Sequence, residues 1–227
     1  APFKPEMQIE CGLSLIFNND KKINLIHTSG QNFDRIVSIY RACKRTNRVF
    51  VIDVYIASIL KTLSTFAKIP FPSKSFKNVR VIFPFFLTQQ LKKNGNEQFF
   101  FQFRNYKITK EEISENADKI VMLVRPSMLK DLWNIPGLDG GNLIYSMWEG
   151  YLQKPATKKL HNYLKNKGFK LYHVHTSGHA DVQTLKRLVT AINPRFIIPI
   201  HTNHANLYKN IFNHCVMVLN DSDELKV

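Results

Sequence analysis

Three histidines lie within seven residues of the chain, in the stretch LYHVHTSGHADVQTLKRLV at 171–189. His173 and His175 are two residues apart on an expected strand, so their side chains share one face. His179 follows a Ser-Gly turn, and the apolar spacing after it predicts a helix. Neutral imidazole is a common zinc ligand and also the usual acid–base group near neutral pH. The stretch therefore predicts a metal site, one part of a catalytic site, or a strand end that happens to be rich in histidine.

The turn within this stretch has a close copy early in the chain. His-Thr-Ser-Gly occurs at 27–30 and again at 175–178, each time at the end of an apolar run that predicts a strand. Ser and Gly at a strand-to-helix turn leave backbone N–H groups free, and the following helix adds positive potential, so such a turn can bind a phosphate group. The alternative is a structural turn, in which Ser177 or Asp181 caps the helix and Gly178 provides the bend. Both roles are open for these two turns.

A third cluster, His-Thr-Asn-His at 201–204, follows the next expected strand. His175, His179 and His201 would supply three of the ligands that a tetrahedral zinc site needs, if their strands are neighbours. Their spacing matches no compact zinc-binding pattern, because HxHxDH, HExxH and paired CxxC are all absent from the sequence. Polar groups that form hydrogen bonds at strand ends are the alternative to a metal site.

The positions of these clusters follow from an alternation of strands and helices. Short apolar runs, typical of strands covered on both faces, alternate with segments whose apolar residues recur at helical spacing. The expected strands cover residues 23–29, 48–54, 78–86, 118–127, 141–148, 169–177, 195–201 and 214–221. This order favours an α/β fold with a Rossmann-like, mostly parallel sheet and helices on both faces. Ligands bind at the carboxyl ends of the strands in such sheets, which is where the three polar clusters lie.

The composition restricts the partners and the compartment. The 227 residues carry 32 Lys and Arg against 17 Asp and Glu, a formal charge of +15 that is spread along the chain, so nucleic acid is the first partner to consider. Three widely separated cysteines without a CxxC motif indicate a reducing compartment, and we expect a cytoplasmic protein. No apolar run approaches the roughly 18 residues that span a bilayer, so no membrane partner is expected.

Several further residues have both a functional and a structural interpretation. Arg35 can reach a phosphate or make a structural ion pair, and Asp53 can contact a ligand or cap the next helix. Trp148 and Tyr151, close to Glu149 in the sequence, can stack on nucleic-acid bases or pack in the core.

At this point the residues carry a resemblance to a known family. SGHADVQTLKRLVTAINPRFIIPIHT at 177–202 resembles the C-terminal part of metallo-β-lactamase-fold hydrolases with a β-CASP insertion, the group that includes ribonuclease J, and its segment PRFIIPIH fits that group's signature closely. HTSGQNFDRIVSIYRACKRTNRVFVIDVY at 27–55 is similar to the start of the β-CASP insert, and YSMWEGYL at 145–152 to its late part. The resemblance covers nearly the whole chain, in order.

This resemblance implies three regions and a set of roles. They are a lead-in segment at 1–22, a β-CASP-like α/β domain at 23–168, and the C-terminal strands and helices of a metallo-β-lactamase fold at 169–227. His179 matches a histidine that assists as general acid near the leaving oxygen, and His201 matches a late ligand of one of two zinc ions, which activate a water and neutralise charge on the phosphodiester. The residues implied to contact phosphate or nucleic acid are Ser177, Gly178, His175, Ser29, Gln31, Asn32 and Arg35.

One departure from the family pattern limits what this chain is expected to do alone. Members of the group carry HxHxDH and further ligands in an N-terminal half, and this sequence has no match to them. We therefore expect the C-terminal portion of a zinc-dependent ribonuclease-like hydrolase, with the other half in the same gene or in a second chain. The portion alone is expected to hold no catalytic zinc pair and to be inactive. The alternative is a metal-free module that binds nucleic acid or a protein, and a homodimer is compatible with either.

Overall fold

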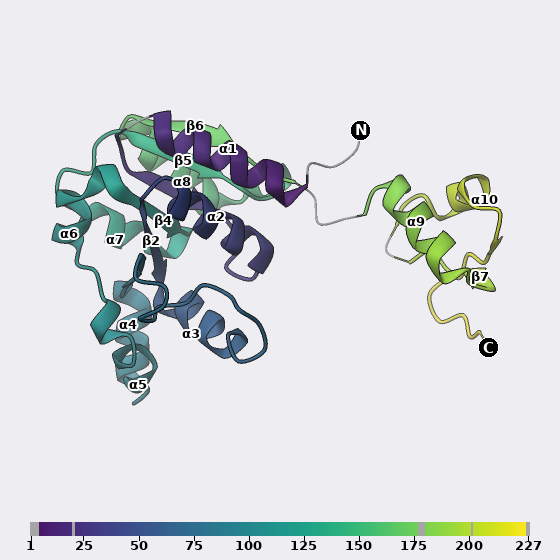
Figure 1. Ribbon diagram of the computed structural model, residues 1–227, viewed down its shortest axis with the longest axis horizontal. Helices are drawn as coiled ribbons and strands as arrows, with labels where there is room; N and C mark the ends of the chain where they lie inside the picture. The colour runs from purple at the N-terminus through teal and green to yellow at the C-terminus, as the bar shows by residue number, and fades with distance from the viewer. Residues whose placement is uncertain (1–4, 20, 177–179, 201, 226–227) are drawn as a thin grey trace. The chain divides into compact units, whose positions relative to one another are not determined.

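The computed structural model describes residues 5–19, 21–176, 180–200 and 202–225. They belong to two compact units, a larger one that extends to Thr176 and a smaller one that contains the described residues from Ala180 onward. Figure 1 labels the elements of both units. No helix among the described residues is both long enough and apolar enough to cross a membrane.

A six-stranded sheet forms the centre of the larger unit. Its strands are arranged in the order β3-β2-β4-β1-β5-β6, and every neighbouring pair is parallel. The strands are β1 (Asn24–His27), β2 (Val49–Asp53), β3 (Val79–Ile82), β4 (Ile120–Val124), β5 (Gly141–Tyr145) and β6 (Phe169–His173). The expected α/β fold with a mostly parallel sheet is therefore confirmed.

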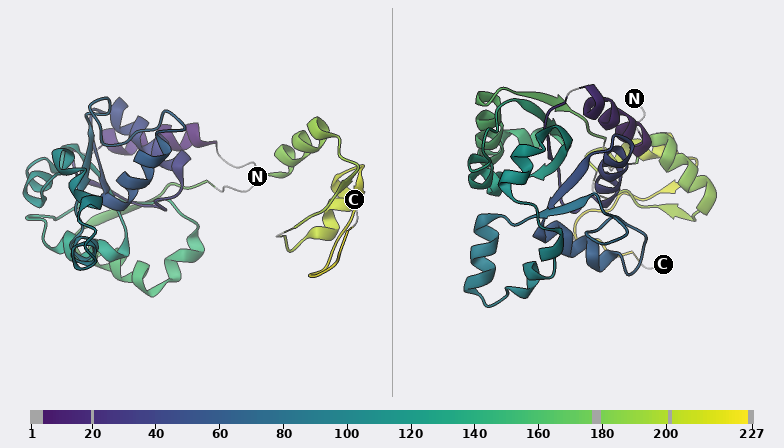
Figure 2. Two further views of the ribbon diagram at one scale, coloured as in Figure 1. Left: turned by 90° about the horizontal axis from the view of Figure 1, so that it is seen from below. Right: turned by 60° about the vertical axis from the view of Figure 1, so that its left-hand side comes forward.

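Helices cover both faces of this sheet because successive strand residues point to opposite sides. Ile26 and Ile144 belong to one apolar cluster, whereas Leu25 and Leu143 belong to the other. The first face is covered by helices that Figures 1 and 2 show around the sheet: α1 (Glu6–Asn19), α2 (Phe33–Arg45), α3 (Val54–Leu63), α4 (Phe85–Lys93) and α5 (Gln98–Phe101). The second face is covered by α6 (Lys110–Glu115), α7 (Leu129–Trp133) and α8 (Pro155–Asn166).

Two parts of the larger unit are absent from the sequence-based assignment of elements. The lead-in segment forms α1, whose Ile9, Leu13 and Phe17 are buried against the core. The segment between β3 and β4 forms three short helices, α4 to α6, with the 3₁₀ turn η1 (Arg104–Tyr106) between α5 and α6. Sequence analysis assigned no element to either part. The apolar residues of α1 recur at helical spacing, so that signal was missed, whereas the segment between β3 and β4 shows no long and regular apolar period.

The smaller unit is built from short elements and buries little apolar surface. It contains α9 (Val182–Ile192), β7 (Phe196–Ile197), η5 (Ala205–Leu207), α10 (Tyr208–Ile211) and β8 (Cys215–Val216), and β7 pairs with β8 in parallel. No described residue of α9 is buried, and the side chains of Leu188 and Ile192 are 53% and 62% exposed. The strand expected at the start of the region 169–227 is instead β6, which pairs with β5 in the large sheet.

Candidate functional site at the carboxyl edge of the sheet

The carboxyl ends of β1, β5 and β6 lie side by side at one edge of the sheet. His27, Tyr145 and His173 are register partners at these ends. Backbone hydrogen bonds continue just beyond them, because the N–H of Ser146 donates to the carbonyl of His27 (3.0 Å) and that of Val174 to the carbonyl of Tyr145 (3.0 Å). Both His-Thr-Ser-Gly motifs therefore begin at the same edge, with β5 between them.

Arg35 connects three segments at this edge and is fully buried. Its Nε and Nη2 donate to the two carboxylate oxygens of Glu6 at 3.1 and 2.9 Å, so α2 is fixed to α1. Its Nη1 donates to Oγ of Ser146, beyond β5, and to the carbonyl of Val174 (3.4 Å), beyond β6. Ser146 Oγ in turn donates to the same Val174 carbonyl at 2.5 Å. Arg35 thus makes the structural ion pair that the sequence left as one of two possibilities, and its guanidinium does not reach solvent.

The carboxylate of Glu6 is stabilised in its ionised form. Burial opposes ionisation, but the hydrogen bonds and charge of Arg35, with a hydrogen bond from Ser38 Oγ (2.9 Å), outweigh it and hold the pKa of Glu6 below its usual value. The pair therefore carries both charges at neutral pH, in a bidentate arrangement that fixes the side chains in orientation as well as distance.

The turn after β1 presents two exposed polar side chains. Ser29 and Gln31 are exposed, and Gln31 Nε2 donates to the hydroxyl of Tyr55 at 3.2 Å. Asn32 is half-buried and caps α2, because its side-chain oxygen accepts a hydrogen bond from the N–H of Arg35 (3.1 Å). Of the four residues implied in this turn and helix, Ser29 and Gln31 are exposed, whereas Asn32 and Arg35 hold the turn in place.

A buried histidine, His27, and a half-buried one, His161, support the same edge. Nδ1 of His27 lies 3.1 Å from Nε2 of His161, which comes from α8. Burial, with the nearby charge of His161, lowers the pKa of His27 to about 4, and burial lowers the pKa of His161 as well. Both rings are therefore neutral near pH 7 and can share one hydrogen bond. His27 thus stabilises the strand end and is too weakly basic to act as an acid at neutral pH.

The first two histidines of the second cluster stack on each other at the end of β6. The rings of His173 and His175 are 6.1 Å apart and nearly parallel, at 11°. His173 is exposed, and its Nδ1 lies 2.8 Å from a carboxylate oxygen of Glu149. His175 is half-buried, and burial, followed by the charges of Arg35 and His173, lowers its pKa. A neutral His175 next to a fixed guanidinium is suited to hydrogen bonding with a ligand and less suited to carrying charge.

Exposed aromatic side chains follow β5 at this edge. Trp148 and Tyr151 are 64% and 42% exposed, and their rings meet edge to face at 5.4 Å. Nζ of Lys154 lies 4.2 Å from the centroid of the Tyr151 ring, and the Tyr145 hydroxyl donates to the carbonyl of Trp148 (2.8 Å). These two rings do not pack in the core, so the stacking role that the sequence left open agrees with their exposure.

Asp53 lies at the end of β2. Of the two roles that the sequence allowed, ligand contact or capping of the next helix, it has the capping role. Its carboxylate accepts hydrogen bonds from the N–H groups of Tyr55 (2.8 Å) and Ile56 (3.1 Å) and so caps α3. It also pairs with Arg125 at 2.7 Å. Burial raises the pKa of Asp53, against the opposing effect of Arg125.

The remaining expected site residues lie outside the described part of the chain. These residues are Ser177, Gly178, His179 and His201. Among the residues that the structure does describe, no group of three or more His, Cys, Asp and Glu side chains is arranged to hold a metal ion. The described residues therefore do not by themselves fit a zinc site.

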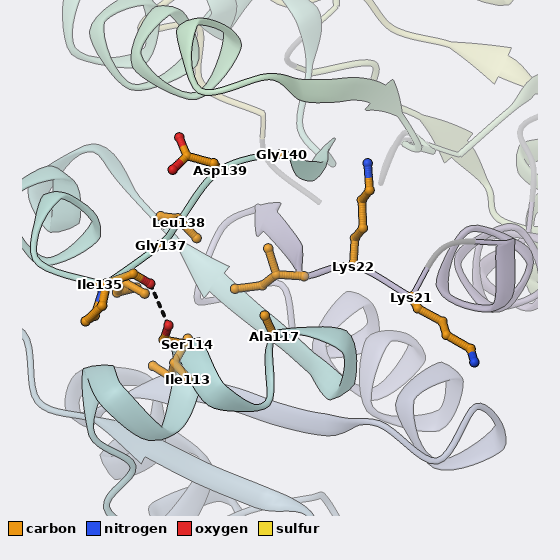
Figure 3. Close-up of a pocket in the computed structure, with 12 residues that line it drawn as sticks. Lys21, Lys22, Ile113, Ser114, Ala117, Ile135, Gly137, Leu138, Asp139 and Gly140 are labelled. Atoms are coloured by element: carbon orange, nitrogen blue, oxygen red, sulfur yellow. Dashed lines mark hydrogen bonds between the residues drawn. The ribbon is translucent and has the colours of Figure 1, made fainter.

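A small cavity of about 180 Å³ lies at the opposite, amino edge of the sheet. Figure 3 shows its lining, which includes Lys21, Lys22 and Asp139, with a hydrogen bond from Ser114 Oγ to the carbonyl of Pro136 (2.6 Å). It lies at the starts of β1 and β5, away from the strand ends that bind ligands in parallel sheets. We therefore assign the candidate site to the carboxyl edge.

Comparisons with known proteins relate part of the chain to a hydrolase family and its fold to a solved structure. Residues 158–209 match the model of the family described as Zn-dependent metallo-hydrolase RNA specificity domain, which supports a relation to metallo-β-lactamase-type hydrolases. No curated protein matches the chain in sequence. A crystal structure of a protein of unknown function from Enterococcus faecalis V583 is similar in fold, with a TM-score of 0.65 at 15% identity. The similarity covers 96% of this chain but only 44% of that protein, so the chain spans less than half of its length.

Proposed function

We propose that this chain is the RNA-binding portion of a zinc-dependent hydrolase that cleaves phosphodiester bonds in RNA. The observation that carries the proposal is the match of residues 158–209 to the RNA specificity domain of Zn-dependent metallo-hydrolases. That range begins in α8, includes β6, and contains the second His-Thr-Ser-Gly motif and the His-Thr-Asn-His cluster. It therefore coincides with the segment that sequence analysis selected on chemical grounds.

The geometry of the carboxyl edge supports binding of a phosphodiester chain. Ser29 and Gln31 offer hydrogen-bonding groups to phosphate or ribose, and Trp148 and Tyr151 offer exposed rings for stacking. The formal charge of +15 favours binding to a polyanion without reading its sequence. Arg35 acts as a positioning residue, because it fixes the chain after β6 immediately before the Ser-Gly turn.

The chemical roles fall on residues beyond Thr176. We assign Ser177 and Gly178 to the phosphate-binding turn and His179 to the general acid that protonates the leaving oxygen. His201 is the proposed metal ligand from this chain, and the other ligands come from a partner half that carries HxHxDH. When bound, the zinc ions would supply an activated water and neutralise charge on the scissile phosphate.

The test uses the full-length protein. Native mass spectrometry reads its mass and its zinc content, and a labelled single-stranded RNA reports binding and cleavage. We expect His201→Ala to lower the zinc content, and His179→Ala to keep zinc and RNA affinity while slowing cleavage about 10²- to 10⁴-fold. His214→Ala, a matched change at a half-buried histidine of the same unit that has no proposed role in the site, serves as the control.

Two results would contradict the proposal in different ways. A full-length protein that binds RNA but contains no zinc and cleaves nothing would be a metal-free binding module. A protein that neither binds nor cleaves RNA would remove the proposal altogether.

A further inference from the structure

A second cleft opens at the carboxyl end of β3, apart from the site described above. It has a volume of about 620 Å³ and is formed mainly by α4, α5, η1 and the start of α6. β3 and β6 form opposite edges of the sheet, so five inter-strand spacings, roughly 24 Å in all, separate the two strand ends. Both sites nevertheless lie at the carboxyl edge.

Phenylalanine rings line this cleft, and several of them remain exposed. Phe83 and Phe100 meet edge to face at 5.6 Å, and Phe100 is only 2% exposed. Phe85 and Phe101, in contrast, are 40% and 48% exposed, and the Phe101 ring lies 4.6 Å from that of Phe100. The cleft thus combines a fixed aromatic floor with the exposed Phe101 ring, whereas Nζ of Lys130 lies over the Phe85 ring, 3.8 Å from its centroid.

Basic side chains surround the rings. Lys92, Arg104 and Lys107 are exposed and form no ion pair within 4 Å in the part of the chain that the structure describes. Nζ of Lys107 lies 5.5 Å from the centroid of the Phe83 ring. The cleft therefore carries unpaired positive charge beside exposed aromatic surface.

Two carboxylates also line the cleft, and one of them is neutralised by an ion pair. Asp131 is fully buried, pairs with Lys110 at 3.0 Å and accepts hydrogen bonds from the N–H of Phe85 at 3.1 and 3.2 Å. Glu111 is the other carboxylate. Because Lys110 offsets Asp131, three cations face Glu111 alone, and the cleft has net positive charge.

We propose that this cleft binds one nucleotide of a single-stranded RNA, with its base against Phe101 and its phosphate at Arg104 and Lys107. A flat apolar surface beside cations matches a base joined to a phosphate, and such stacking platforms accept any base. An unpaired strand is required, because bases in an A-form duplex cannot be splayed out to reach rings inside a cleft. The inference rests on the proposed binding of RNA and adds to it a separate site that requires no cleavage.

The location of the cleft explains why the ligand is a strand and not a free nucleotide. An RNA that lies along the carboxyl edge passes the exposed groups near β1, β5 and β6 and reaches β3 roughly 24 Å away. Contacts at both ends of the edge then act together, so a longer oligonucleotide binds more tightly than a short one that reaches one end only.

The experiment measures RNA affinity of the full-length protein in the His179→Ala background by fluorescence anisotropy at several salt concentrations. We expect Phe101→Leu to weaken binding of a 20-nucleotide single strand about 5- to 100-fold. The double variant Arg104→Gln/Lys107→Gln should lower the slope of log affinity against log salt by about 0.7, which corresponds to the one phosphate proposed to lie at these two side chains. Lys21→Gln/Lys22→Gln removes the same charge at the amino edge and should leave the slope unchanged.

Three results would overturn the inference. Equal effects of the two double variants would mean that only net charge matters. Unchanged RNA affinity in Phe101→Leu would rule out the stacking contact. If adenosine monophosphate bound in the cleft while neither cleft variant changed the affinity for RNA, the cleft would be a site for free nucleotides. A wild-type protein that never cleaves RNA, yet loses RNA affinity in Phe101→Leu, would contradict the proposed hydrolase and keep the cleft.

Discussion

At the scale of single residues, Arg35 illustrates how one side chain can serve a site without touching the ligand. Its guanidinium has no exposed surface, yet it holds Glu6 of α1, Ser146 after β5 and the backbone of Val174 after β6. A buried cation with fixed partners sets the path of the chain that leads into the Ser-Gly turn. Because the guanidinium is buried, removing the carboxylate of Glu6 would lower the stability of the fold.

The two members of this ion pair should respond differently to substitution. Glu6→Gln leaves a fully buried guanidinium without an anion, so we expect it to lower the free energy of unfolding by about 3–5 kcal/mol. Arg35→Gln leaves a carboxylate whose side chain is 32% exposed and can hydrate, so its cost should be smaller. Urea unfolding monitored by circular dichroism measures both values.

Ser38→Ala provides the control for this prediction. It removes one hydrogen bond to Glu6 but no charge, and should cost only about 1 kcal/mol. If Glu6→Gln cost no more than Ser38→Ala, the buried charge would be solvated by some other group and the structural role of the pair would be wrong.

At the scale of elements, the start of β5 shows how closely the central strands are packed. Gly141 has a φ of +144°, and a Cβ atom at this position would lie 2.8 Å from the carbonyl oxygen of Ile23 and 2.7 Å from the ring of Phe169. These contacts come from both neighbours of β5, because Ile23 precedes β1 and Phe169 begins β6. The strand that links the two motif-bearing strands thus admits only glycine at its first residue.

Gly141→Ala should therefore destabilise the larger unit. Positive φ and a clash with backbone together predict a loss of about 2–3 kcal/mol in the free energy of unfolding. Gly12→Ala is the matched control, because Gly12 lies within helix α1 with no atom within 4 Å of the added methyl group. That change should stabilise the protein by about 0.5–1 kcal/mol. Equal effects of the two alanines in thermal unfolding would contradict this account of β5.

At the scale of the whole molecule, the two units differ in how much apolar surface they bury. Every residue of β1 and β4 is buried, whereas no described residue of α9 is. Local opening costs less where few apolar contacts must be broken. The smaller unit should therefore open with a lower free energy than the sheet.

Hydrogen exchange measured residue by residue tests this difference. We expect the amides of β1 and β4 to exchange slowest, near the free energy of global unfolding, and those of α9 and β7 to exchange at a distinctly lower free energy. The amides of α8 serve as the reference within the larger unit, because this helix buries Leu160 and Leu164 against the same sheet. Protection of α9 and β7 equal to that of β1 would mean that the two units unfold together.

The sequence by itself determined the class of the fold and placed the two His-Thr-Ser-Gly motifs of the candidate site at strand ends. Apolar runs such as Val49–Asp53 and Ile120–Val124 are short and continuous, as strands covered on both faces must be, and helical periods separate them. Because this pattern is local, it can be read without knowing which strands are neighbours. The placement of the two His-Thr-Ser-Gly motifs at strand ends followed directly.

Only the tertiary structure decided which of those residues are exposed and which are held by other segments. Arg35 meets Glu6 across 29 positions of sequence and Ser146 across 111, and no local pattern records such partners. The same holds for the cleft near β3, whose rings come from short helices with no regular apolar period. Strand order and side-chain burial depend on contacts between distant segments, which form only when the whole sheet assembles, and this is why they could not be derived from periodicity and spacing.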